Sequence, residues 1–369
     1  MSPSSGAAQN VAQGAAWKLS PDPVLRIGED QTSATEFLRI TGMTRTATGN
    51  IIIANSGTNE LRVFSSAGKF VKSFGRRGAG PGEFQSMRWV GKNGDSVYLH
   101  DSQSMRISTF TVNGGFVTSK LIPSVMRGAR IYPMARFSNG DFLLQPIRAR
   151  SQSTQRADGV FRDSTPAGIL LDAHPDSATW IGPFPFMSWL AYNPVGLGTQ
   201  PAVDLYEFGP KSRWVVWGNL LWIGDEASNE LMLVDKAGKI VNRVQLPWAP
   251  RPYDKLVFER AAKSALAQLS AEERNRFTQA EYSTKYLPRF EPSFKQFLVA
   301  PEGQLWVERF HFDPATPGEC VVMTRAGTVV AHLTIPGNFE PQEIGSDYVL
   351  GVARDGDGVE TVAMYRIWK

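Results

Sequence analysis

Short apolar runs alternate with turns rich in glycine, asparagine and aspartate along most of the chain. Two stretches show the pattern most clearly: GNIIIANSGTNELRVFSSAGKFV from Gly49, and GNLLWIGDEASNELMLVDKAGKIV from Gly218. Each has a Gly-Asn turn, an apolar run, a polar loop ending Asn-Glu-Leu, a second apolar run, an Ala-Gly-Lys turn and a third apolar run. Apolar runs separated by turns that favour positive φ predict antiparallel strands joined in hairpins.

The pattern recurs from Gly94, Asn139, Glu302 and Ser346, and an inner strand such as SMRWVGK precedes each copy. The residues that close the first apolar run of the six copies are Asn55, Asp101, Gln145, Asp225, Glu308 and Ala353. Their separations are 46, 44, 80, 83 and 45 residues, and the two long intervals contain insertions. A unit of about 45 residues with four short strands is typical of a propeller blade. The sequence therefore predicts an all-β fold, a six-bladed β-propeller of four-stranded antiparallel blades.

The two ends of the chain are predicted to meet. The last copy ends at Lys369 after its third strand, so one strand is missing there. WKLSPDPVLRIG, residues 17–28, precedes the first blade and is predicted to close the last one, which would remove an open sheet edge. Residues 17–369 would then form a single propeller domain. Residues 1–16 are small and polar, which predicts a disordered N-terminal segment.

Two segments do not fit the repeat. Residues 253–287, between blades 4 and 5, are rich in Ala, Leu, Glu and Arg and predict a small helical insertion. Within it, Ser270 and Glu273 form a capping box that would start a second short helix. Residues 180–210 read as a long aromatic connection between blades 3 and 4. Its aromatic residues either line an apolar site or pack the connection against the ring: Phe184, Phe186, Trp189 and Tyr192.

Composition excludes several classes of protein. The 39 basic and 35 acidic residues give a net charge of +4, and they are scattered, so no basic stripe for nucleic acid is present. No apolar run approaches the roughly 18 residues that a membrane span needs. The one cysteine, Cys320, lies in an apolar run and is predicted to be buried. The N-terminus lacks secretory-signal features, so we expect an extracytoplasmic protein whose signal has been removed or, alternatively, a cytoplasmic one.

The stretch FGRRGAGPGEF, residues 74–84, has the glycine content of a phosphate-binding loop. It lacks the Lys-Ser/Thr pair of such loops, and a strand rather than a helix follows it, so the helix N-terminus that binds the phosphate is missing. We interpret it as the link from the outer strand of blade 1 to the inner strand of blade 2.

Links between blades lie on the same face of a propeller as the loops between the second and third strands. A ligand is therefore expected on this loop face, at or near the central channel. The predicted ligand-binding residues are the charged residues of this face and of two Arg-Trp-Val inner strands: Arg76, Arg77, Glu83, Arg88, Asp101, Arg106, Arg213, Asp225, Glu230, Arg309 and Arg354. Taken singly, each of these charges also has a structural interpretation, as an ion-pair or loop-bonding group.

The phrase FGRRGAGPGEF, followed by SVYLHDSQSMRISTFTVNGGFV, resembles the NHL repeat: a Phe-Gly, a linker ending Gly-Glu-Phe, a strand ending in Asp, an Arg-Ile and a glycine turn. The chain is also similar to bacterial six-bladed propellers of the TolB-like group, which are mostly exported. Six-bladed lactonases imply Ca²⁺ at the central channel, and the matching residue types here are Asn55, Asp101, Asp225 and Glu308. Six-bladed amidating lyases use zinc-binding histidines, but the spacing of the four histidines here (His100, His174, His311 and His332) assembles no such set.

The leading hypothesis is a monomeric, non-catalytic binding propeller. Its partner would be a protein, a peptide or a small polar ligand on the loop face, with no nucleic acid and no membrane span. The alternative is a calcium- or zinc-assisted hydrolase or lyase with carboxylates at the channel mouth. The sequence identifies no catalytic residues.

Overall fold

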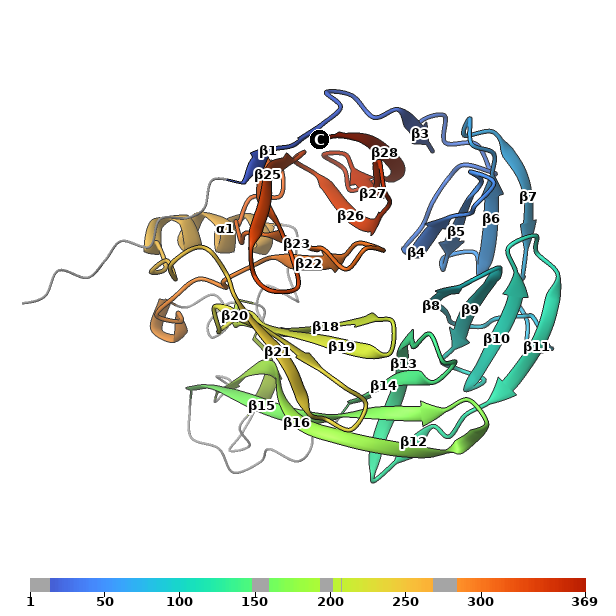
Figure 1. Ribbon diagram of the computed structural model, residues 1–369, viewed down its shortest axis with the longest axis horizontal. Coiled ribbons are helices and arrows are strands. Elements are labelled where there is room, and N and C mark those ends of the chain that lie inside the picture. The colour runs from blue at the N-terminus through green and yellow to red at the C-terminus, as the bar shows by residue number, and fades with distance from the viewer. Residues whose placement is uncertain (1–13, 148–158, 193–201, 207, 268–283) are drawn as a thin grey trace, which may run out of the picture.

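Six antiparallel sheets surround a central axis, so the protein is the six-bladed β-propeller that the sequence predicts (Figure 1). The computed structural model describes residues 14–147, 159–192, 202–206, 208–267 and 284–369. Apart from the N-terminal strands added at the outer edges of blades 5 and 6, the strands of each blade run outward in sequence order, from an inner strand beside the axis to an outer strand at the rim.

Blades 1, 2 and 4 are regular four-stranded sheets. Blade 1 contains β4 (Ile40–Arg45), β5 (Ile51–Asn55), β6 (Glu60–Phe64) and β7 (Phe70–Phe74). Blade 2 contains β8 (Met87–Asn93), β9 (Ser96–Asp101), β10 (Arg106–Thr111) and β11 (Phe116–Leu121). Blade 4 contains β18 (Ser212–Trp217), β19 (Leu220–Asp225), β20 (Glu230–Val234) and β21 (Ile240–Gln245).

Blades 3, 5 and 6 carry additional strands. Blade 3 contains β12 (Val125–Met126), β13 (Ala129–Arg136), β14 (Phe142–Ile147), β15 (Gly159–Leu171), β16 (His174–Tyr192) and β17 (Ala202–Leu205). Blade 5 contains β22 (Gln296–Val299), β23 (Leu305–Glu308), β24 (Gly318–Met323) and β25 (Val329–Ile335), with β1 (Ala15–Ala16) at its edge. Blade 6 contains β26 (Phe339–Ile344), β27 (Tyr348–Arg354) and β28 (Glu360–Trp368), completed by β2 (Lys18–Leu19) and β3 (Leu25–Ile27).

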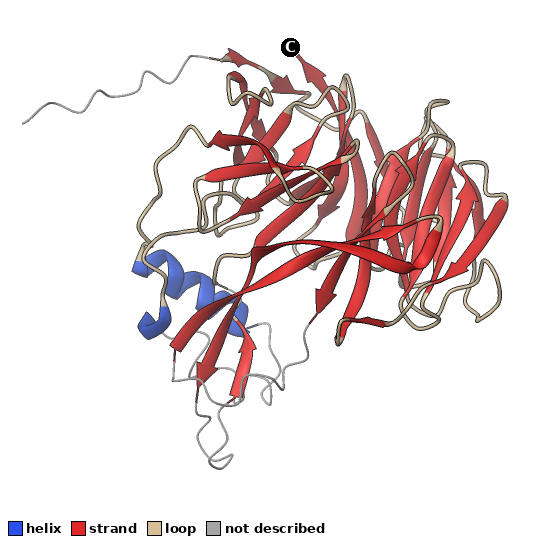
Figure 2. Ribbon diagram, turned by 60° about the horizontal axis from the view of Figure 1, so that its bottom comes forward, coloured by secondary structure: helices blue, strands red, loops and turns tan. Residues whose placement is uncertain are grey.

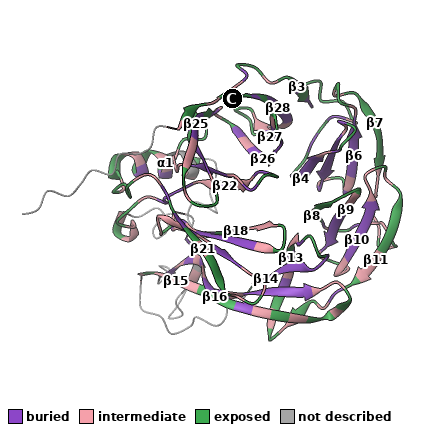
Figure 3. Cartoon of the chain, in the orientation of Figure 1, coloured by how far each residue is buried: buried purple, intermediate pink, exposed green. Residues whose placement is uncertain are grey.

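The hydrophobic core lies between neighbouring blades. Successive residues of β5 are buried on both sides, since Ile53 packs toward blade 6 and Ile52 toward blade 2. The middle strands therefore bury both faces and do not alternate between apolar and polar residues, whereas the outer strands β7 and β11 are largely exposed (Figure 3).

The N-terminal segment joins the last two blades. Ala15–Ala16 pair in parallel with β25 of blade 5. The chain then crosses to blade 6, where β2 and β3 both pair antiparallel with β28. Leu25 and Ile27 are buried between blades 6 and 1, so the closing strand adds apolar contacts as well as backbone hydrogen bonds. The expected disordered segment 1–16 is therefore too long, because Ala15 and Ala16 are in a strand; residues 1–13 lie outside the described residues.

The segment 180–210 is not the connecting loop that the sequence suggested. Up to Tyr192 it continues β16, which pairs with the long strand β15, and β17 adds a further strand beside β16. Phe184 and Phe186 are buried and contact Trp214 of blade 4 at ring-centroid distances of 6.2 and 5.8 Å. These two side chains therefore pack the extension against the ring; the side chain of Tyr192 lies outside the described part.

The insertion between blades 4 and 5 forms the helix α1 (Lys255–Ala267) and the short 3-10 helix η2 (Thr284–Tyr286). The helix lies beside the segment that follows β17 (Figure 2). The rings of Phe258 and Phe208 pack with their centroids 4.8 Å apart, and the Tyr253 hydroxyl donates a hydrogen bond to the Phe208 carbonyl. The second helix expected from Ser270 lies outside the described residues. None of the helices described has the length and apolar character that crossing a membrane would take.

The stretch 74–84 connects blade 1 to blade 2, as interpreted from its sequence. Phe74 and Phe84 pack at its two ends in the core between these blades. Gly75 and Gly82 have φ angles of 73° and 75°, which residues with a Cβ avoid. Arg76 and Glu83 form an ion pair across the loop at 2.6 Å, and Glu83 also accepts a hydrogen bond from the Gly80 amide.

Candidate functional site

The loop face of blades 4, 5 and 6 surrounds a cavity of about 940 Å³ at the mouth of the channel. Three inner strands begin at its rim: β18, β22 and β26. The lining side chains come from these strand starts and from two loops: Arg213, Lys295, Gln296, Pro314, Ala315, Asn338, Phe339, Glu340, Arg354, Asp355 and Asp357, together with Gly356 and Gly358. Of the predicted ligand-binding residues, Arg213 and Arg354 lie here.

The basic residues of the cavity form ion pairs with carboxylates. Arg213 donates from Nε to Glu226 at 3.2 Å, and Lys295 donates to Glu308 at 2.8 Å. Arg354 binds two carboxylates, those of Glu340 at 2.8 Å and Glu360 at 3.0 Å. These ion pairs fix the positions of the basic side chains around the mouth.

Glu308 is a buried carboxylate behind the cavity wall. Burial favours its protonated form, but hydrogen bonds from His311, Lys295 and Gln296 outweigh this and hold the pKa of Glu308 below its ordinary value. The other ring nitrogen of His311 faces the Asp313 carbonyl at 2.8 Å. Glu308 therefore ties the loop after β23, which supplies Pro314 and Ala315 to the cavity, to the start of β22.

Glu226 is held differently. Burial raises the pKa of Glu226, although Arg213 and the Lys211 amide donate hydrogen bonds to it. Its backbone carbonyl also accepts from the Ser293 amide, so this residue links the start of blade 4 to the segment that enters blade 5. The two carboxylates thus support the walls that present Arg213 and Lys295.

The four residues proposed as calcium ligands do not come together. The residue two positions before each of them on the same strand packs toward one neighbouring blade, and the side chain itself faces the same way. On this basis Asn55 of blade 1 faces blade 6, and Asp101 of blade 2 faces blade 1. Asp225 of blade 4 faces blade 3, and Glu308 of blade 5 faces blade 6. These are four different interfaces between blades. Across the described residues, no group of three or more His, Cys, Asp or Glu side chains is arranged to hold a metal ion.

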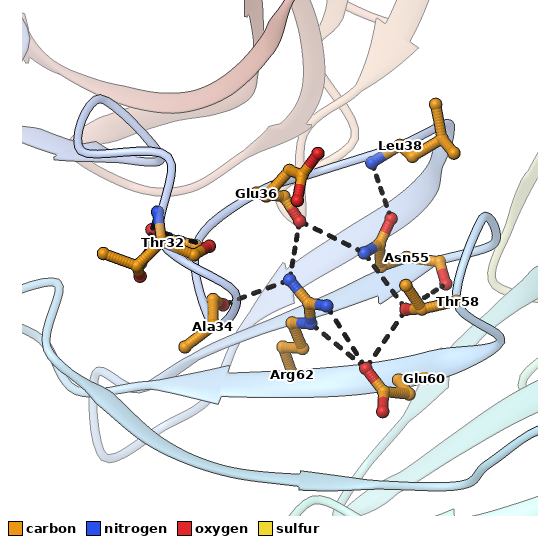
Figure 4. A network of polar contacts seen from close by, with 9 residues as sticks. Thr32, Ala34, Glu36, Leu38, Asn55, Thr58, Glu60 and Arg62 are labelled. Atoms are coloured by element: carbon orange, nitrogen blue, oxygen red, sulfur yellow. Dashed lines mark hydrogen bonds and ion pairs between the residues drawn. The ribbon is translucent and has the colours of Figure 1, made fainter.

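Each of these four side chains binds protein groups instead. Asn55 accepts the Leu38 amide at 2.9 Å and donates to Thr58, while the neighbouring Arg62 binds the carbonyls of Ala34 and Glu36 (Figure 4). Together Asn55 and Arg62 fasten the link from blade 6 to blade 1.

Asp101 fastens the next link in the same way. Its carboxylate accepts hydrogen bonds from the amides of Gln85, Ser86 and Gln103 and from the Ser104 hydroxyl. Burial opposes ionisation, but these four donors outweigh it and lower the pKa of Asp101. Asp225 differs, because it binds Arg162 of the blade 3 extension at 2.6 Å.

The remaining predicted residues lie apart from the cavity. Arg77 lies in the link 74–84, and Arg106, the first residue of β10, donates to the Ala79 carbonyl of that link at 3.2 Å. Arg88 stacks over Tyr132 across the interface between blades 2 and 3, and Glu230 binds Arg243. Arg309 lines a second cavity, of about 800 Å³, beside Trp17 and Trp248.

His100 belongs to no metal-binding group of side chains among the described residues. Burial lowers its pKa to about 4, so the ring is neutral, and neither ring nitrogen makes a hydrogen bond within the described part of the chain. The ring packs edge-on against Tyr132 at 6.2 Å.

Sequence reasoning missed Lys295, Gln296, Asn338 and Glu340. One signal was available for Glu340, its register position on the inner strand. Glu340 pairs with Val352, the residue just before Ala353, which closes the second strand of blade 6. Arg213 pairs with the equivalent residue of blade 4, Gly224, just before Asp225. Aligning the inner strands as well as the second strands would have placed Glu340 beside Arg213 at the mouth.

Comparison with known proteins agrees with the fold. Residues 32–155 match the family model DUF5128, described as a 6-bladed beta-propeller. The match spans the first two blades and part of the third. A comparison with curated proteins gives no match.

Several solved structures share the architecture over nearly the whole chain. A member of the DUF4221 family from Bacteroides vulgatus has a TM-score of 0.56 at 9% identity, covering 97% of this chain and 100% of that one. A Bacteroides fragilis protein whose description suggests export has a TM-score of 0.50 at 12% identity, covering 96% and 95%. Enzymes are also among the similar structures. Virginiamycin B lyase from Staphylococcus aureus has a TM-score of 0.45 at 12% identity, covering 96% and 99%, which is too distant to support an argument about activity.

Proposed function

We propose that the protein is a binding propeller that holds a small polar ligand, or the end of a peptide, in the cavity at the channel mouth. The observation that carries this proposal is the cavity of about 940 Å³ where three inner strands begin. Ligand sites commonly have volumes of roughly 300–1,000 Å³ and a few well-placed polar groups. Since rigid strands and ion pairs hold Arg213, Lys295 and Glu340, a ligand would meet a preformed surface.

The alternative is metal-assisted hydrolysis of a lactone or ester by carboxylates at the channel mouth. Such a reaction needs ligands that converge on one ion. Asn55, Asp101, Asp225 and Glu308 face four different interfaces and bind protein groups there, so the geometry favours binding. A stoichiometric metal ion in the purified protein, lost on replacing Asp225 by Asn, would instead favour the enzyme.

The proposal is tested with a thermal-shift panel of carboxylates, amines, amino acids and short peptides. Arg213→Gln should weaken the best ligand at least about tenfold, because a charged hydrogen bond contributes about 1.5–3 kcal/mol. Arg88→Gln is the matched control, since Arg88 occupies the same register position in blade 2 but does not line the cavity. If both variants bind equally well, the cavity is not the binding site.

We also place the protein outside the cytoplasm, as expected from the resemblance to exported propellers. Fractionation of the native host tests this location. Recovery in the cytoplasmic fraction would contradict it without affecting the binding proposal.

A further inference from the structure

One side of the mouth cavity presents free hydrogen-bond donors. Arg213 binds Glu226 only through Nε, and its two terminal nitrogens make no hydrogen bond with any described residue. Among the described residues Lys295 donates to Glu308 alone, which leaves two of its three N–H groups. Both residues stand at the entrances to their inner strands, in blades 4 and 5. This side therefore offers donors with positive charge.

The side of the cavity that blade 6 forms presents free acceptors. Glu340 uses Oε2 to bind Arg354, and its other oxygen accepts nothing from the described chain. The carboxylate of Asp357 likewise makes no hydrogen bond within the described residues. Asp355 accepts hydrogen bonds from the amides of Asp357 and Val359 through Oδ1, and its Oδ2 has no partner in the part of the chain that the structure describes. This side offers oxygens with negative charge.

Arg354 is the one basic residue on the acidic side, and its charge is already compensated. Its two terminal nitrogens bind Glu340 and Glu360 at 2.8 and 3.0 Å. Glu360 in turn accepts the Ile40 amide at 2.7 Å, which fixes it at the entrance to blade 1. The free donors and free acceptors of the cavity are therefore separated between its two sides.

We propose that the ligand is a zwitterion, a short peptide or amino acid with free amino and carboxyl ends. This inference rests on the proposed function. The carboxylate would bind Arg213 and Lys295, because guanidinium and ammonium groups form strong charge-assisted hydrogen bonds with carboxylates. The amino group would bind Glu340 and Asp357. A ligand with a single charge would form ion pairs on one side only, so it would bind more weakly than the zwitterion.

The experiment is calorimetric titration of the full chain with alanine peptides of one to five residues. Each peptide is supplied free, N-acetylated, C-amidated and blocked at both ends. We expect the free form of one length to bind and each single block to weaken it at least about tenfold. Arg213→Gln should reduce the penalty for amidation, because only Lys295 then binds the carboxylate, and should retain the penalty for acetylation. The double variant Glu340→Gln, Asp357→Asn should do the reverse, and circular dichroism checks that both are folded.

The outcomes separate this inference from the proposed function. Two results would overturn the zwitterion inference and leave the binding site standing. In the first, blocking either end of the peptide leaves its affinity unchanged. In the second, no free peptide binds, but a singly charged member of the panel binds in an Arg213-dependent manner. If no member of the panel binds in an Arg213-dependent manner, both fail. The inference is supported if amidation and acetylation both weaken binding, Arg213→Gln reduces only the effect of amidation, and the Glu340→Gln, Asp357→Asn variant reduces only the effect of acetylation.

Discussion

The closure of the ring by β3 gives a stability prediction that can be worked from the structure. Ile27 is 2% exposed and packs in the core between blades 6 and 1, paired with Val362 of β28. Ile27→Ala removes three carbon atoms, at about 0.8 kcal/mol for each buried methylene. The cavity that remains adds to this, so the expected loss of unfolding free energy is about 2–4 kcal/mol.

Urea unfolding followed by tryptophan fluorescence measures this loss. Arg26→Ala is the control, because Arg26 lies on the same strand with its side chain exposed, and its ion pair with Glu29 is a surface pair worth about 0–1 kcal/mol. We expect one cooperative transition whose midpoint falls for Ile27→Ala and hardly moves for Arg26→Ala. Equal midpoints for the two variants, or an early separate transition in Ile27→Ala, would refute the view that β3 stabilises the whole ring.

Three further predictions concern other buried groups. Glu308 has a lowered pKa, so its contribution to stability is present above the ordinary value of 4.5 and is lost as pH falls through the lowered one; urea titrations of Glu308→Gln should lack that acid-dependent loss. Asp101→Ala should cost about 2–4 kcal/mol, because three amides lose their acceptor, whereas Asp357→Ala should stay within about 0.5. Phe258→Ala should cost about 3–5 kcal/mol and the exposed Leu256→Ala almost nothing, by the same measurement.

The blades could be predicted from the sequence because each is a local unit. The second strands, the Gly turns and the roughly 45-residue spacing all follow from hairpins whose strands are neighbours in the chain. The structure confirms the six sheets and the role of the stretch 74–84 as a link between blades. Residues 180–192 were predicted as a connecting loop because their aromatic residues and prolines are typical of one. They form a strand instead, because they pair with residues 159–168 of β15.

The candidate site was only partly predictable. Arg213 and Arg354 were identified from their places at strand ends, but Lys295 and Glu340 follow insertions or lie in strands with weak repeat similarity. Asp101 has the residue type of a ligand, and only its hydrogen bonds show that it fastens the link before blade 2.

The sequence by itself determined the number of blades, the order of their strands and the face on which the links lie. These depend on local periodicity and on turns. Only the tertiary structure decided which side chains meet. Glu308 and Asp225 are equivalent in the repeat, yet Trp306 packs toward blade 6 and Ile223 toward blade 3, so the two carboxylates point into different interfaces. Successive side chains of a strand point to opposite faces, so moving the strand by one residue turns each side chain to the other neighbouring blade. Packing between the blades decides which of the two positions a strand takes.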